Sequence, residues 1–136
     1  MLEILAPAGN AECAKAAIDS GANAIYLGYS AFSARQSAEN FNLDTLLETI
    51  QNAHLCGVFV YVAMNTVIKD GETEEFLRTL LNVWNAGADA IILQDLLLGK
   101  AVKEKYPQIV LHLSTQAGVC ITHGYDAKNP SLSYAY

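Results

Sequence analysis

The chain has 136 residues, of which 52% are hydrophobic, so it can bury one ordinary core and is expected to form a single domain. Eight Lys and Arg residues against 14 Asp and Glu give a formal charge of -6, which argues against a large phosphate-neutralising surface on this chain. No apolar run approaches the roughly 20 residues that span a bilayer, and the N-terminus carries the acid Glu3 where a secretory signal is basic, so we expect a cytoplasmic protein that contacts no membrane.

Short apolar runs alternate with amphipathic segments, which predicts strands and helices in turn. The first half should contain strands at 3–6, 24–27 and 58–63, a helix at 10–20 capped by Asn10, and a helix whose apolar face covers 43–53. The second half should contain a helix at about 73–86, a strand at 90–93, a helix at about 96–105 and a strand at 109–113. The irregular stretch 28–42 is long for a strand-to-helix connection, which makes it a candidate functional loop.

Three glycines mark a repeat, because each stands where a helix should end and a buried strand follow. Gly21, Gly57 and Gly87 are 36 and 30 residues apart, the length of one βα unit. The spacing predicts an α/β fold of repeated βα units with about four to five parallel strands. A dinucleotide fold is disfavoured, since the first turn, residues 6–10, lacks the GxGxxG pattern. We therefore predict a partial (β/α)8, TIM-barrel-like sheet.

A complete barrel takes about 250 residues, so residues 1–118 are expected to form the N-terminal half of such a domain. Residues 119–136 lack the helical period that should follow the fifth strand, which predicts an irregular C-terminal tail and favours a truncated sequence. An open half-barrel exposes its edge strands and its inner sheet face. We therefore expect either a homo-oligomer or a missing C-terminal half to supply the remaining strands.

In barrels the functional side chains lie at the carboxyl ends of the strands. In this chain those positions are polar, rich in amides and nearly uncharged, which is typical of a site that orients a substrate by hydrogen bonds. Arg35 could grip a carboxylate or phosphate with its planar guanidinium, or it could cap a helix or pair with Glu39. The amides could bind substrate or satisfy loop backbone groups. The candidate substrate-binding residues are Asn10, Tyr26, Arg35, Asn65, Thr115 and Gln116.

Two residues near the same ends are candidates for a catalytic role. His112 could act as an acid–base group or be a satisfied core or rim histidine, and Asp95 could position a base or a metal or simply begin a helix. A pairing of Cys120 with His112 or His123 as nucleophile and base lacks an evident third residue. The histidines and cysteines show no metal-ligand spacing, so we expect neither a metal nor a cofactor within this chain.

Seven short motifs occur in the same order as in a known family and cover about residues 2–118. The chain resembles the N-terminal half of the collagenase-like peptidase family U32. The motifs are Leu5-Ala-Pro-Ala-Gly-Asn10, Tyr26-Leu-Gly28, Phe32-Ser-Ala-Arg35, Asn40-Phe41, Asn65-Thr66, Gln94-Asp95 and Ser114-Thr-Gln116. The resemblance implies either a protease or an oxygen-independent hydroxylase of ribosomal RNA, transfer RNA or the ubiquinone ring, and hence a peptide or an RNA substrate.

For the hydroxylase branch, the resemblance also implies an iron–sulfur cluster or a prephenate-derived oxygen source. The family's cysteine-rich signature lies downstream of the matched region and is absent here, and Cys13 and Cys56 have no place in it. The cluster ligands are therefore not expected in this chain, which should not carry the complete activity by itself. The alternatives are a small-ligand-binding half-barrel that self-associates without catalysis and a fragment without activity.

Overall fold

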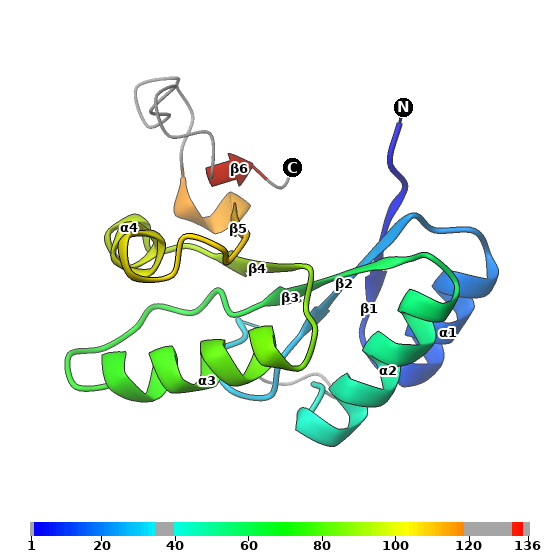
Figure 1. The fold of residues 1–136 in the computed structure, drawn as a ribbon, viewed down its shortest axis with the longest axis horizontal. Helices are drawn as coiled ribbons and strands as arrows, with labels where there is room; N and C mark the ends of the chain where they lie inside the picture. The colour runs from blue at the N-terminus through cyan, green and yellow to red at the C-terminus, as the bar shows by residue number, and fades with distance from the viewer. Residues whose placement is uncertain (1, 35–39, 119–131, 135–136) are drawn as a thin grey trace.

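The computed structural model describes residues 2–34, 40–118 and 132–134 and shows an α/β fold in which helices alternate with parallel strands (Figure 1). The strands pair in sequence order, β1-β2-β3-β4-β5-β6. They are β1 (Leu5–Ala8), β2 (Ala24–Gly28), β3 (Phe59–Ala63), β4 (Ala90–Leu93), β5 (Leu111–Leu113) and β6 (Leu132–Tyr134). The helices are α1 (Ala11–Asp19), α2 (Leu43–Leu55), α3 (Thr73–Asn85) and α4 (Leu96–Lys105), followed by the 3-10 turn η1 (Thr115–Ala117).

The expected partial barrel is confirmed, since β1 to β5 are parallel and each is joined to the next through a helix. The outer strands begin two residues later than predicted. Before β1, the Ile4 N–H donates to the side-chain Oδ1 of Asn23 at 2.8 Å and not to a strand backbone. At β5, Ile109 still closes a turn with Tyr106. β6 lies inside the segment 119–136, for which the sequence predicts no regular element.

Local capping explains where the helices begin and end. Asn10 caps α1 as predicted, with its Oδ1 accepting from the Cys13 N–H at 2.8 Å. The predicted glycines Gly21, Gly57 and Gly87 have φ angles of 87°, 72° and 105°, in the left-handed region that glycine enters without a Cβ clash. Each glycine therefore ends one βα unit and lets the chain turn into the next strand.

The core lies between the sheet and the helices. Alternate residues of β2 to β5 point into it, and they pack against buried side chains of α2, α3 and α4 such as Leu46, Phe76 and Val102. The opposite face of the sheet is more open, because Phe59 is 51% exposed and Val110 is 40% exposed. The fold thus has one face covered by helices and one partly exposed face, called the uncovered face below, in the part of the chain that the structure describes.

At the amino ends of the central strands, a carboxylate ties two strands together. Asp89 Oδ2 accepts from the Val60 N–H at 2.7 Å and lies 2.8 Å from His54 Nε2. The Asp89 N–H in turn donates to the Val60 carbonyl at 2.9 Å. These bonds extend the pairing of β3 and β4 at the amino ends of the two strands.

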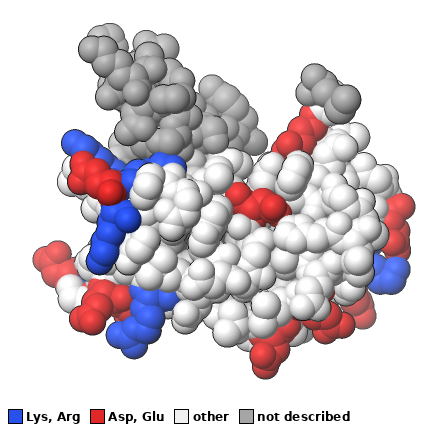
Figure 2. Space-filling view, in the orientation of Figure 1, with Lys and Arg blue, Asp and Glu red and all other residues white. Residues whose placement is uncertain are grey.

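Charged side chains do not form one continuous basic surface on the face shown in Figure 2. The basic side chains in that view lie mainly on the side of α3 and α4 and are mixed with acidic ones. Among the described residues, no helix is long and apolar enough to cross a membrane.

Candidate functional site

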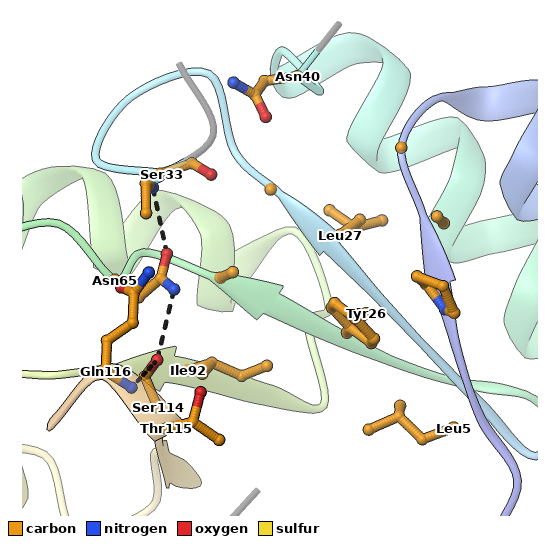
Figure 3. A pocket seen from close by; sticks show the side chains of 16 residues that line it. Leu5, Tyr26, Leu27, Ser33, Asn40, Asn65, Ile92, Ser114, Thr115 and Gln116 are labelled. Atoms are coloured by element: carbon orange, nitrogen blue, oxygen red, sulfur yellow. Dashed lines mark hydrogen bonds between the residues drawn. The ribbon is translucent and has the colours of Figure 1, made fainter. Parts of the chain in front are cut away.

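A cleft of about 300 Å³ lies at the carboxyl ends of the strands, where barrel enzymes place their chemistry (Figure 3). Strand residues such as Leu5, Tyr26 and Ile92 supply its apolar part. Its polar part comes from the loops that follow β2, β3 and β5, and none of the described residues that line the cleft carries a charge. The polar side chains are those of Ser33, Asn40, Asn65, Ser114, Thr115 and Gln116.

The loop after β2 packs directly on the backbone of that strand. A Cβ placed on Gly28 would lie 2.6 Å from both Ser33 Oγ and Asn40 Oδ1, closer than real Cβ contacts allow. Phe41 fixes the returning end of the loop, since its N–H donates to the Gly28 carbonyl at 3.0 Å and its carbonyl accepts from Ser30 at 2.8 Å. Glycine at position 28 therefore lets two polar side chains approach the end of the sheet.

Phe32 anchors the other end of this loop. Its φ of 65° makes it the one described residue other than glycine with a positive φ, and such a backbone is unfavourable for a bulky side chain. The ring meets Phe76 of α3 edge-on with centroids 5.3 Å apart, and the Phe32 carbonyl accepts from the Thr66 N–H at 3.2 Å. These contacts offset the unfavourable backbone conformation of Phe32 and hold the adjacent Ser33 and Ala34 at the cleft.

Asn65 connects three loops at the centre of the polar wall (Figure 3). Its Oδ1 accepts from the Ala34 N–H at 3.2 Å, and its Nδ2 donates to Ser114 Oγ at 3.4 Å. Ser114 Oγ also accepts from the Gln116 N–H at 3.3 Å. The ends of β2, β3 and β5 are thus joined by one side-chain network.

The predicted substrate-binding residues fall into three groups. Tyr26, Asn65, Thr115 and Gln116 line the cleft together. Asn10 does not line it, and its side chain caps α1. Arg35 lies outside the described residues.

Neither candidate for a catalytic role lines the cleft. Asp95 caps α4, with Oδ1 accepting from the Leu98 N–H at 2.9 Å, which is the alternative role considered above. His112 lies on β5 with its ring against Tyr61, the centroids 4.7 Å apart and the planes at 75°. Cys120 and His123 lie outside the described residues.

His112 is in an environment that disfavours its charged form. Its Nδ1 is buried and has no hydrogen-bond partner among the described residues. Burial therefore lowers the pKa of His112 below the usual 6.5, although the charge of Glu3 opposes this. The neighbouring Tyr61 hydroxyl donates to Glu3 Oε1 at 3.1 Å, and burial followed by this bond raises the pKa of Tyr61 to about 12. Neutral His112 and neutral Tyr61 thus prevail at physiological pH.

Sequence reasoning did not single out three polar residues of the cleft: Ser33, Asn40 and Ser114. All three lie within short motifs that carry the family resemblance, so the motifs contained a usable signal. Their convergence depends on the turn at Phe32 and on Gly28, which no periodicity reveals. No group of three or more His, Cys, Asp and Glu side chains that could hold a metal ion occurs among the described residues.

Comparison with known proteins gives one family for most of the chain. The profile of peptidase family U32 matches residues 9–127. The chain is 37% identical over 118 residues to the 23S rRNA 5-hydroxycytidine C2501 synthase of Escherichia coli (strain K12), covering 87% of this chain and 18% of that protein. It is 36% identical over 115 residues to tRNA hydroxylation protein P of the same organism, covering 85% of this chain and 25% of that protein.

A protease-named relative and a solved structure are similar over much of the chain as well. The uncharacterized protease MJ0090 of Methanocaldococcus jannaschii is 38% identical over 96 residues, which are 71% of this chain and 24% of that protein. The structure of the U32 peptidase Mk0906 superposes with a TM-score of 0.69 at 13% identity, over 91% of this chain and 53% of that one. The chain thus spans about a fifth to a quarter of the length of these curated relatives.

Proposed function

Because the chain belongs to peptidase family U32, as the motifs predicted and the match over residues 9–127 shows, we propose that it forms the substrate-recognition part of an enzyme that acts in the hydroxylation of an RNA base. Two of the relatives described above carry names for RNA hydroxylation. Since the chain spans 18% and 25% of those proteins, the complete reaction would need groups that lie elsewhere in a longer polypeptide or in a partner.

The composition of the cleft is the observation that carries this proposal. An RNA base is a flat, uncharged ring with hydrogen-bonding edges, and proteins hold such rings by stacking and by amide or hydroxyl groups. Tyr26 supplies an aromatic ring beside the apolar side chains, and Asn65 and Gln116 supply amides at the polar wall. The lack of charge among the described lining residues suits a neutral ring better than a phosphate.

An iron–sulfur cluster, which the family resemblance implies for the hydroxylases, does not fit the described residues. Cluster ligands are usually several thiolates close together. Cys13 and Cys56 are exposed, unpaired thiols, and no group of three metal-ligating side chains occurs in the described part of the chain. The proposal therefore assigns this chain substrate binding and no redox step.

Peptide hydrolysis is a second candidate, because the family and the Methanocaldococcus jannaschii relative carry peptidase names. Cleavage by a serine or cysteine needs a nucleophile within hydrogen-bond reach of a base. The Ser114 hydroxyl at the cleft contacts Asn65 Nδ2 and the Gln116 N–H, neither of which is a base. His112, two residues earlier, does not line the cleft.

We also propose that the uncovered face of the sheet is completed by further strands, from a second copy or from the rest of a longer polypeptide. The exposure of Phe59 and Val110 on the face opposite to the helices supports this, since soluble proteins seldom leave such an apolar face open. A self-associating half-barrel that binds a small ligand without catalysis is the alternative with the same fold.

Tyr26 provides the direct test of an RNA base as ligand. The four ribonucleosides and a short collagen-like peptide would be titrated into the 15N-labelled chain, with binding followed by amide chemical shifts. We expect nucleoside binding that Tyr26→Ala weakens about fivefold or more, because base–aromatic stacking contributes roughly 1–3 kcal/mol. Tyr61→Ala is the matched control, since Tyr61 is the register partner of Tyr26 but does not line the cleft. Binding of the peptide alone would favour the peptidase instead.

A further inference from the structure

We infer that the Ser114 hydroxyl donates a hydrogen bond to a carbonyl oxygen of the ligand in the cleft. Ser114 lines the cleft, and the residue as a whole is only 7% exposed. The inference rests on the proposed function only in taking this cleft as the binding site, and it adds the ligand group that the site receives.

The hydrogen bonds of Ser114 leave its donor unused. A serine hydroxyl has two acceptor lone pairs and one hydrogen to donate. Oγ accepts from Asn65 Nδ2 and from the Gln116 N–H, which occupies both lone pairs. Among the described residues, Ser114 donates no side-chain hydrogen bond. The donor is thus free of protein acceptors at the wall of the cleft, and a ligand acceptor that enters would take the place of water on it.

The direction of the Asn65 bond follows from a third residue. The amide oxygen and nitrogen of an asparagine are assigned from their partners. Ala34 presents a backbone N–H to Asn65, which requires the oxygen on that side and places the nitrogen toward Ser114. The reverse arrangement, with Ser114 donating to Asn65, would leave two N–H groups facing each other at Ala34.

The backbone holds Ser114 in place for this role. Its N–H donates to the Leu93 carbonyl of β4 at 2.7 Å, directly beside Ile92 of the cleft. The hydroxyl is therefore fixed relative to the apolar part of the cleft and needs little reordering when a ligand enters. A flat ring on the apolar side chains with a carbonyl at its edge satisfies both parts of the site.

The experiment compares two small aromatic probes. Benzamide and toluene both present an apolar ring, but only benzamide carries a carbonyl oxygen. Dissociation constants would be measured by amide chemical-shift titration for the wild type, Ser114→Ala and Ser114→Thr. We expect Ser114→Ala to weaken benzamide about two- to tenfold, the range of a single net hydrogen bond. Toluene binding should stay within twofold, and Ser114→Thr should restore benzamide binding because it keeps the hydroxyl.

Equal weakening of both probes would overturn the inference, since it would show a loosened turn in place of a lost donor. Absence of benzamide binding to the wild type would overturn it too. Ser114→Cys, which nearly keeps the side-chain volume but is a weak donor, replaces Ser114→Ala if that variant does not fold. If benzoate bound more tightly than benzamide, the Ser114 hydroxyl would be assigned to a ligand carboxylate instead of a neutral carbonyl. Benzamide binding that depends on Ser114, without nucleoside binding, would retain this inference and remove the RNA base.

Discussion

Tyr26 and Tyr61 stand side by side as register partners on β2 and β3, yet only Tyr26 lines the cleft. Tyr61 instead meets His112 and hydrogen-bonds Glu3. The open face of the sheet therefore carries two adjacent aromatic groups in different surroundings. One belongs to the proposed binding site, and the other belongs to a titratable cluster beside it.

Gly28→Ala should disrupt the cleft. The new Cβ would lie 2.6 Å from Ser33 Oγ and Asn40 Oδ1, so the loop must move away from the end of β2. We expect a loss of about 1–3 kcal/mol in the free energy of unfolding, as for other overpacked sites, together with weaker binding of benzamide. Gly9→Ala is the control, because Gly9 also lines the cleft and has nothing within 4 Å of a new Cβ. Urea unfolding of both variants measures the difference, and equal losses would contradict the packing argument.

Asp89→Ala should destabilise the sheet at its amino end. The substitution leaves the Val60 N–H without its charged acceptor and removes the partner of His54. A hydrogen bond to a charged group contributes about 1.5–3 kcal/mol, and the partial exposure of Asp89 places the loss at the lower end of that range. Asp19→Ala removes an exposed surface pair with Lys15, and we expect it to leave the stability nearly unchanged. Thermal unfolding that ranks the two variants in the reverse order would be evidence against the Asp89 bridge.

The helices and strands could be predicted from the sequence wherever one local signal dominated. The predicted strand at 90–93 and helix at 96–105 agree with β4 and α4, because a fully apolar run is followed directly by Asp95 at the N-cap. The first residues of the outer strands β1 and β5 could not be predicted as well. Ile4 and Ile109 continue the apolar pattern of a strand, but the Ile4 N–H bonds the Asn23 side chain and Ile109 closes a turn with Tyr106.

The residues that line the cleft could be predicted only in part, for a different reason. The carboxyl ends of the strands could be located from sequence, and Tyr26 and Asn65 do line the cleft. Whether an end residue faces the cleft depends on neighbouring strands and on loop packing. His112 turns toward Tyr61, and the loop after β2 reaches the cleft through a left-handed Phe32, a conformation that no sequence rule assigns to phenylalanine.

Phe59→Ser tests whether the open sheet face is covered by a second copy. In solution the wild-type chain is expected to have at least twice its 14.7 kDa mass by light scattering, because an exposed aromatic face and parallel strand edges favour pairing. Phe59→Ser should lower that mass, since a polar group would then meet an apolar partner surface. Leu55→Ser is the control, as Leu55 is 86% exposed at the end of α2. A wild-type chain that remains monomeric at all concentrations would exclude self-association.

His112 should make the chain less stable as the pH falls. Its pKa in the folded chain lies below the 6.5 of an ordinary histidine, so between these values the unfolded chain binds a proton that the folded chain does not. The free energy of unfolding therefore decreases as the pH is lowered through 6.5 and levels off below the folded pKa. His112→Gln should reduce the difference in stability between about pH 8 and pH 5, as measured by urea unfolding. An NMR titration of the His112 ring gives its folded pKa directly, and a value at or above 6.5 would contradict this prediction.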